Sequence, residues 1–193
     1  MGNFYVNITT RKVSVNELVD FLKSKSLNAF IIEGPNDYCT IYEEICDEQN
    51  TKHISSLLLE ISNQFSCPAI GMLNHDDDIL AYELWLNGEK IDEYDSSPNY
   101  FDMDAEEIAK PSGGNAKLLS EHMGVSSNEE EIEKVLRTSF EEDESFVFAV
   151  DRHEALVKAV GLPHHSVGYG FRYISEGETP DEINPDNIIT ING

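Results

Sequence analysis

The chain has 193 residues, 40% of them hydrophobic, and its 37 acidic against 13 basic residues give a formal net charge of −24. This charge argues against binding to nucleic-acid phosphates or to an anionic membrane, because both require a basic surface. Every apolar run is far shorter than the roughly 18 residues of a membrane-spanning helix. The charge favours solubility and a basic protein partner or cations, with adaptation to high salt as the other origin.

Three cysteines, Cys39, Cys46 and Cys67, are an odd number and form no CxxC pair. Disulfides are rare in reducing compartments, so reduced thiols in a cytoplasmic protein are the simplest interpretation. The first residues, MGNFYVNITTRK, lack the charged segment followed by an apolar stretch that marks a secretory signal. No nucleotide, cofactor or catalytic motif of high specificity is present.

The first hundred residues predict an alternation of strands and helices. Residues 3–9 alternate between apolar and polar side chains, as a half-buried strand does. Ser14 with Glu17 forms a capping box that starts a helix. Asn87-Gly88 is a strong signal for a two-residue hairpin turn. The predicted strands are residues 3–9, 28–33, 38–43, 69–73, 79–86 and 89–95, and the predicted helices are residues 14–25 and 51–65.

This order of elements predicts an α+β fold. Strand, helix, strand, strand, helix, strand is the order of a ferredoxin-like, split βαβ arrangement, with an antiparallel or mixed sheet and helices on one face. The hairpin that follows would extend the sheet at its edge. Each predicted helix has a single apolar stripe, so we expect residues 14–25 and 51–65 to pack on the same face.

The composition changes after residue 101. Three helices are predicted in this part: residues 116–123, a helix that Asn128 caps, and residues 152–160. Asp151 and Glu154 form a second capping box at the start of the last one. Two β-prone runs follow the strand pattern. These runs are residues 145–150 and 166–174. The predicted organisation is an α+β sheet domain with a β-meander (1–101), a helical and mixed portion packed on it (102–175) and a polar tail (176–193).

The hairpin offers the sharpest site hypothesis. A two-residue turn pairs residues whose numbers sum to 175, which places Glu83 directly opposite Asp92. One face of the hairpin then carries Glu83 and Asp92 with Trp85 and Tyr94. Like charges placed opposite each other destabilise a sheet, whereas a binding surface can use aromatic anchors beside paired carboxylates. The alternative is a solvated strand whose repulsion is relieved by Lys90 or by water.

The same register brings Asp95 to the end of the sheet that carries Asp76, Asp77 and Asp78. Carboxylate oxygens are the ligands that Ca²⁺ prefers, so these four residues are a candidate metal site. The calcium-loop pattern is absent, however, and short polar residues are ordinary in a hairpin turn because they bond their own backbone. A simple turn is therefore the favoured interpretation, and Ca²⁺ is the one cofactor that the sequence leaves open.

Three other patterns have ordinary structural interpretations. The run KPSGGN at residues 110–115 precedes a helix but has neither P-loop spacing nor a basic environment, which favours a capping loop. His164-His165 would need His153 or Asp151 to complete a transition-metal site, and a surface pair is favoured. The alternating aromatic residues of 166–174 are more typical of a core face than of a stacking platform.

Two classes of function follow from these features. The first is a non-enzymatic interaction module that binds a basic protein partner, as small acidic inhibitors and immunity proteins do. The second is a carboxylate-based or metal-dependent hydrolase with its site near Asp76–Asp95. The oligomeric state and the identity of a partner or substrate do not follow from the sequence.

Overall fold

The computed structural model describes residues 2–102, 104, 109–125, 127–139 and 146–193. Its strands are β1 (Tyr5–Arg11), β2 (Ala29–Glu33), β3 (Tyr38–Glu43), β4 (Pro68–His75), β5 (Ile79–Leu86), β6 (Glu89–Asp95), β7 (Ser112–Gly113) and β8 (Ile188–Ile191). Its helices are α1 (Val15–Ser24), α2 (Glu44–Asp47), α3 (Thr51–Phe65), α4 (Ala116–His122), α5 (Glu129–Arg137), α6 (Ala149–Val160) and α7 (Phe171–Ser175), with short 3-10 turns η2 (His164–Ser166) and η3 (Pro185–Asn187).

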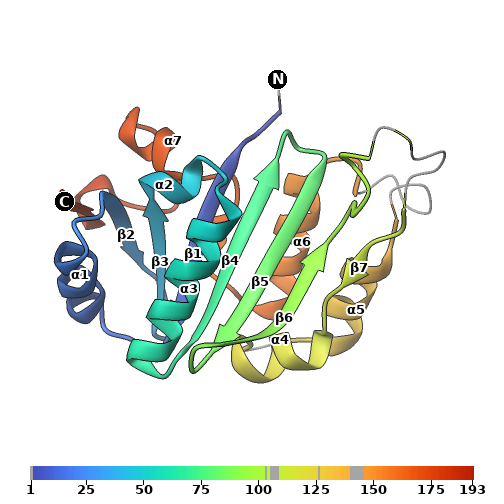
Figure 1. Ribbon diagram of the computed structural model, residues 1–193, viewed down its shortest axis with the longest axis horizontal. Helices are drawn as coiled ribbons and strands as arrows, with labels where there is room; N and C mark the ends of the chain where they lie inside the picture. The colour runs from blue at the N-terminus through green and yellow to red at the C-terminus, as the bar shows by residue number, and fades with distance from the viewer. Residues whose placement is uncertain (1, 103, 105–108, 126, 140–145) are drawn as a thin grey trace.

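The strands form one eight-stranded sheet in the order β7-β6-β5-β4-β1-β3-β2-β8. Every neighbouring pair is antiparallel. Figure 1 shows α1 and α3 in front of this sheet and α6 behind it. The predicted α+β class is confirmed at this level. In the part of the chain that the structure describes, no helix has the length and apolar character that crossing a membrane requires.

The front layer was predicted correctly. The capping box of Ser14 and Glu17 starts α1, and the Asn50 side chain caps α3 by accepting from the His53 backbone N–H. Both helices turn their apolar stripes onto the same side of the sheet, where Leu22 of α1 and Leu58 of α3 belong to one buried cluster.

The predicted C-terminal helical portion lies on the other face of the sheet, which the sequence did not indicate. Helices α4, α5 and α6 cover the opposite face, in a second buried cluster that includes Leu119, Leu136 and Leu156. The cause lies in the strands, which are apolar on both sides: Leu84 of β5 points into the back cluster and Trp85 into the front one. A sheet with two apolar faces needs a cover on each.

The hairpin register was predicted correctly only near the turn. Asn87 and Gly88 have φ values of 53° and 79°, and Leu86 pairs with Glu89 as expected. Beyond that point Trp85 pairs with Lys90 but Leu84 pairs with Asp92, so Ile91 is the extra residue of a β-bulge. All later partners move by one position, and the side chains that follow the bulge change face.

The C-terminal third differs most from the prediction. Helix α6 begins at Ala149, so the last two residues of the predicted strand 145–150 are helical, and Ser145 lies outside the described residues. Asp151, predicted to cap the helix, lies inside it. Residues 166–174 form η2, a connection and α7 in place of a strand. Gly168 has a φ of 81°, a left-handed conformation that interrupts an extended chain.

The predicted polar tail ends in a strand. β8 pairs with β2 over four residues and completes one edge of the sheet, with Ile191 buried in the front cluster. The backbone N–H of Gly193 donates to the side chain of Asn28, which fixes the last residue. A four-residue strand between polar segments is too short to be recognised by its periodicity.

Candidate functional site

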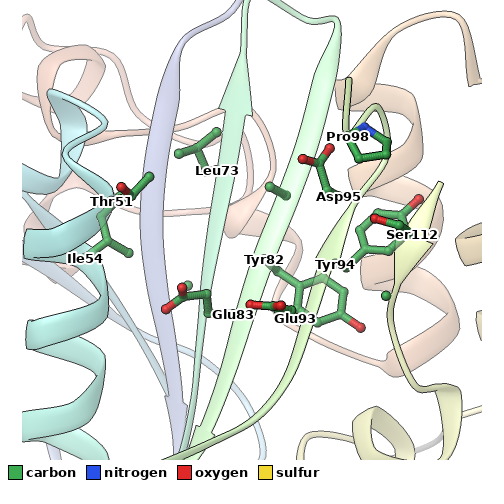
Figure 2. A pocket seen from close by; sticks show the side chains of 13 residues that line it. Thr51, Ile54, Leu73, Tyr82, Glu83, Glu93, Tyr94, Asp95, Pro98 and Ser112 are labelled. Carbon is green, nitrogen blue, oxygen red and sulfur yellow. The ribbon is translucent and has the colours of Figure 1, made fainter. Parts of the chain in front are cut away.

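A groove crosses the front face where α3 no longer covers the sheet. It has a volume of about 390 Å³ and lies between the start of α3 and the segment that carries Pro98 and Ser112 (Figure 2). Strands β4, β5 and β6 form its floor. Helix α3 packs against β4 and β5, whereas β7 is only two residues long and adds little cover beyond β6.

The floor of the groove is made of small and apolar residues. Gly71 and Ala81 contribute almost no side chain, and Leu73 and Ile54 flank them. A Cβ at Gly71 would come within 2.8 Å of a Leu58 methyl group, so a larger residue here would force the Leu58 side chain to move. The result is an apolar surface that can accept the aliphatic part of a ligand.

Three carboxylates, Glu83, Glu93 and Asp95, also line the groove (Figure 2). Glu83 is the most firmly held. Ser55 Oγ lies 3.0 and 2.8 Å from its two oxygens, and Trp85 Nε1–H donates to it at 2.9 Å. These bonds fix the carboxylate and place the only tryptophan of the chain in contact with the site.

Lys90 lies between the two glutamates that the bulge brings opposite each other. Glu83 pairs with Glu93 across the strands, and Lys90 Nζ lies 3.3 Å from the first carboxylate and 2.5 Å from the second. The hydrogen bond to Glu93 is the largest cause that raises the pKa of Lys90. Lys90 therefore relieves the repulsion between the opposed Glu83 and Glu93 carboxylates. The Glu83–Asp92 pair, for which the sequence suggested the same relief, does not form.

Asp95 differs from the two glutamates. Burial raises the pKa of its carboxyl group, and the opposing contribution comes from the backbone N–H of Ser97, which donates at 2.8 Å. Among the described residues, no lysine or arginine forms an ion pair with this carboxylate. Asp95 is therefore the carboxylate of the groove that no basic side chain of the described residues pairs with.

The four residues of the predicted hairpin surface do not share a face. Glu83 and Trp85 are on the front, whereas the bulge sends Asp92 and Tyr94 to the back. Tyr94 is only 3% exposed and stacks on Tyr82, whose hydroxyl donates to Asp92 at 2.8 Å. Trp85 is 8% exposed and packs in the front core. The bulge, which has no signal in the sequence, replaces Asp92 in the predicted pair by Glu93.

The acidic turn is held by hydrogen bonds within the chain. Asp76 accepts from the backbone of Gly2, and Asp77 accepts from both the backbone and the side chain of Asn3. Asp78 accepts from the hydroxyl of Tyr100. Asp76 and Asp77 have the positive φ values of a tight turn. Together with Asp95, which faces the groove, these residues do not form a metal-binding group within the described part of the chain.

A different group has the composition of a metal site. Glu43, Cys46 and His53 hold one ligand atom each within 4.8 Å of one another, and they are the single such group among the described residues. The sequence spacing, Glu-x₂-Cys-x₆-His, was not recognised because it matches no known ligand pattern.

The other histidine candidates, His153, His164 and His165, do not form a metal-binding group among the described residues. His153 is fully buried against Tyr5, with 2.7 Å between its Nδ1 and the tyrosine hydroxyl. His165 is buried with Nε2 3.1 Å from Thr40 Oγ1, whereas His164 is exposed. Burial lowers the pKa of His153 to about 3 and that of His165 to about 4. His153 and His165 therefore act as neutral hydrogen-bonding groups of the core.

Comparison with known proteins gives no relative from which to transfer a function. No family model matches the chain, and no curated protein or solved structure is significantly similar to it.

Proposed function

We propose that the protein is a non-enzymatic binding module that holds a basic segment of another protein in the groove. The proposal is carried by Asp95, a half-buried carboxylate that lacks a basic partner within the described residues. Glu83 and Glu93 add negative charge along the same groove, and the net charge of −24 would attract a cationic partner. This is the chemistry of small acidic inhibitors and immunity proteins.

The shape of the groove favours lysine or arginine side chains. Both carry an aliphatic stem that can lie on apolar surface while the charged head reaches polar groups. Ala81 contributes only a methyl group to the floor, which leaves space for such a stem, and the carboxylates lie beside it. Lys90 already uses two of these carboxylates in this way, which makes it an internal stand-in for a ligand cation.

Trp85 provides the measurement, because its indole N–H is bonded to Glu83. Tryptophan fluorescence should change when short peptides of lysine, arginine and apolar residues are added, and not with matched acidic peptides. Replacing Glu93→Gln together with Asp95→Asn should weaken this binding at least tenfold, about 1.4 kcal/mol or more.

The control removes the same charge elsewhere. Glu129→Gln with Glu131→Gln, in the first turn of α5, should change affinity less than about twofold, since exposed charges act mainly through screened, long-range attraction. If both double variants weaken binding equally, the peptides respond only to net charge and the groove is not the site.

A carboxylate-based hydrolase is the second candidate, favoured by the raised pKa of Asp95 in a groove with other carboxylates. A carboxyl group of raised pKa can act as a general acid near neutral pH. Turnover of chromogenic glycosides or esters that disappears in Asp95→Asn, with peptide binding absent from the parent protein, would favour the enzyme over the binder.

The topology also supports a finer proposal about the fold. The strands β4-β1-β3-β2 are adjacent and antiparallel in this order, and α1 and α3 lie on their front face. We propose that these elements form a split βαβ unit, to which β5, β6, β7 and β8 add strands at the two edges. A fragment without β8 that keeps the front core folded would support this division.

A further inference from the structure

The end of β3 and the two helices that follow it bring three side chains of different chemistry together. Glu43 is the last residue of β3, Cys46 lies in α2, and His53 lies in the first turn of α3. Helix α2 packs against both β3 and α3, so a chain of eleven residues folds back on itself at this point (Figure 1). His53 Nε2 is 2.9 Å from Glu43 Oε2.

The Glu43 carboxylate is fixed before any ligand arrives. Its two oxygens accept hydrogen bonds from the backbone N–H groups of Ile45 and Cys46, at 3.1 and 2.8 Å. The side chain is 1% exposed, whereas that of His53 is 25% exposed. The carboxylate is therefore held in place, the Cys46 thiol is buried with it, and the imidazole forms the side of the group that solvent can reach.

We propose that Glu43, Cys46 and His53 bind a zinc ion. Zn²⁺ is bound by thiolate, imidazole and carboxylate at about 2.0 to 2.3 Å, so tetrahedral ligand atoms are about 3.5 Å apart. The three ligand atoms already lie within 4.8 Å of one another, so small side-chain shifts close the site. Water would occupy the fourth position, on the side of His53.

The charges and the ligand types select zinc over the hard cations. A thiolate and a carboxylate carry two negative charges, which the divalent ion neutralises, so a buried group becomes neutral overall. Calcium and magnesium prefer oxygen ligands and take six or more of them, which a site with one carboxylate, one thiol and one imidazole does not offer. The thiol makes soft, nitrogen-binding and sulfur-binding metals the class that fits.

The site is distinct from the groove and does not depend on the proposed function. The alternative role of these residues is structural: Glu43 caps α2 and pairs with His53, which joins α2 to α3. The variant His53→Gln separates the two roles. The glutamine amide can still donate to Glu43, but it is a poor zinc ligand.

The experiment uses the full chain after treatment with a chelator, with Zn²⁺ and Co²⁺ salts as the probes. Competition with a chromophoric chelator should show one tight zinc site, and cobalt should give the thiolate charge-transfer band and the strong visible bands of tetrahedral coordination. His53→Gln and Cys46→Ser should each weaken zinc binding about 100-fold or more, since loss of outer-sphere partners alone weakens it 10- to 100-fold.

The matched controls are Cys67→Ser, a second buried cysteine of the front core, and His75→Gln, a second histidine near the surface. Both should keep the zinc affinity and the cobalt spectrum of the parent. A cobalt complex without the thiolate band, or zinc affinity that His53→Gln and Cys46→Ser leave unchanged, would show that the metal binds to surface carboxylates and would overturn the proposal.

Discussion

The two faces of the central sheet are built from different chemistry. On the front, the buried cluster under α1 and α3 is apolar, with residues such as Ile8, Leu22 and Leu58. On the back, the middle of the sheet carries a buried polar network. Its members, all on β1, β3 or the segments that cover them, are Asn7, Thr9, Thr40, His153, His165 and Ser166.

The back network is joined by specific hydrogen bonds. The Asn7 amide donates to the backbone carbonyls of Ser166 and Tyr169, at 2.7 and 3.0 Å. Thr40 Oγ1 lies 3.1 Å from both Thr9 Oγ1 and His165 Nε2. The irregular chain between α6 and α7 is thus attached to the sheet by polar groups, where a regular helix would have used apolar packing.

The two faces therefore hold the segments that pack on them in different ways. An apolar face tolerates many sequences, because the hydrophobic effect has no direction. A polar face requires particular partners and protonation states, because each buried group that loses its partner is destabilising. We therefore expect the front to respond mainly to volume and the back mainly to pH and to single hydrogen bonds.

The largest expected effect is loss of stability in mild acid. Burial lowers the folded-state pKa of His153 to about 3 and of His165 to about 4, below the value near 6.5 of the unfolded chain. Below pH 6.5 the unfolded chain binds protons that the folded protein does not, so stability decreases as pH falls. Between about pH 7 and pH 5 each histidine should remove about 2 kcal/mol.

Urea unfolding at both pH values measures this loss. His165→Gln should reduce this loss of stability between pH 7 and pH 5 by roughly half. His164→Gln, at the exposed neighbouring position, should reduce the loss only slightly, because it removes a charge near both buried histidines. Asp47 and Asp95, whose pKa values burial raises, contribute in the opposite direction in more acidic solution. Equal stability at both pH values would show that the histidines are not held neutral.

The front face should respond to a cavity instead. Leu58 is fully buried and meets Gly71, whereas the next residue, Leu59, is 41% exposed on the same helix. Leu58→Ala should cost about 3 kcal/mol through lost burial and a cavity, at both pH values. Leu59→Ala should cost less than about 0.5 kcal/mol. A Leu58→Ala loss that depended on pH would contradict the separation of the two faces.

The front layer was predictable because its signals are local and periodic. Each of these signals indicates a single structure from a few neighbouring residues. They are the capping box at Ser14, the apolar stripe of residues 51–65 and the Asn87-Gly88 turn. The back layer was predicted poorly. Its covering chain is attached by side chains such as Asn7, more than 150 positions away in the sequence, and such pairings leave no periodic pattern.

The candidate groove could be predicted only in part. Glu83 was identified, and its partner was taken to be Asp92, because one inserted residue at Ile91 has no sequence signal. The role of Gly71 as floor was not apparent either, since a single glycine in a strand has several explanations. The group of Glu43, Cys46 and His53 depends on how α2 folds back, which the sequence does not state.

A single hydrogen-bonding residue tests the back network at intermediate cost. Asn7→Ala would leave the carbonyls of Ser166 and Tyr169 without their donor, and we expect a loss of about 2 kcal/mol. Hydrogen exchange should become faster in the segment that follows α6, and not in α3. The exposed Asn63, replaced by Ala in the same way, should change stability less than about 0.5 kcal/mol.

The smallest effect tests the bulge that divides β6 between the two faces. Glu93 lies on the front with Lys90, whereas Asp92 lies on the back and accepts from Tyr82 and from the Asn115 backbone. Double-mutant cycles with Lys90→Ala should therefore give coupling to Glu93→Gln of a few tenths up to about 1 kcal/mol, and coupling to Asp92→Asn near zero.

Salt dependence sharpens this test, because an exposed ion pair is screened while the back-face hydrogen bonds of Asp92 are not. The Lys90–Glu93 coupling should decrease in high salt, and the loss caused by Asp92→Asn alone should remain. In the register without a bulge, Glu83 faces Asp92 and Lys90 would couple to Asp92 instead. That result would place Asp92 on the front face and remove Glu93 from the groove. The coupling energy of Lys90 therefore determines which carboxylates line the groove that a ligand would enter.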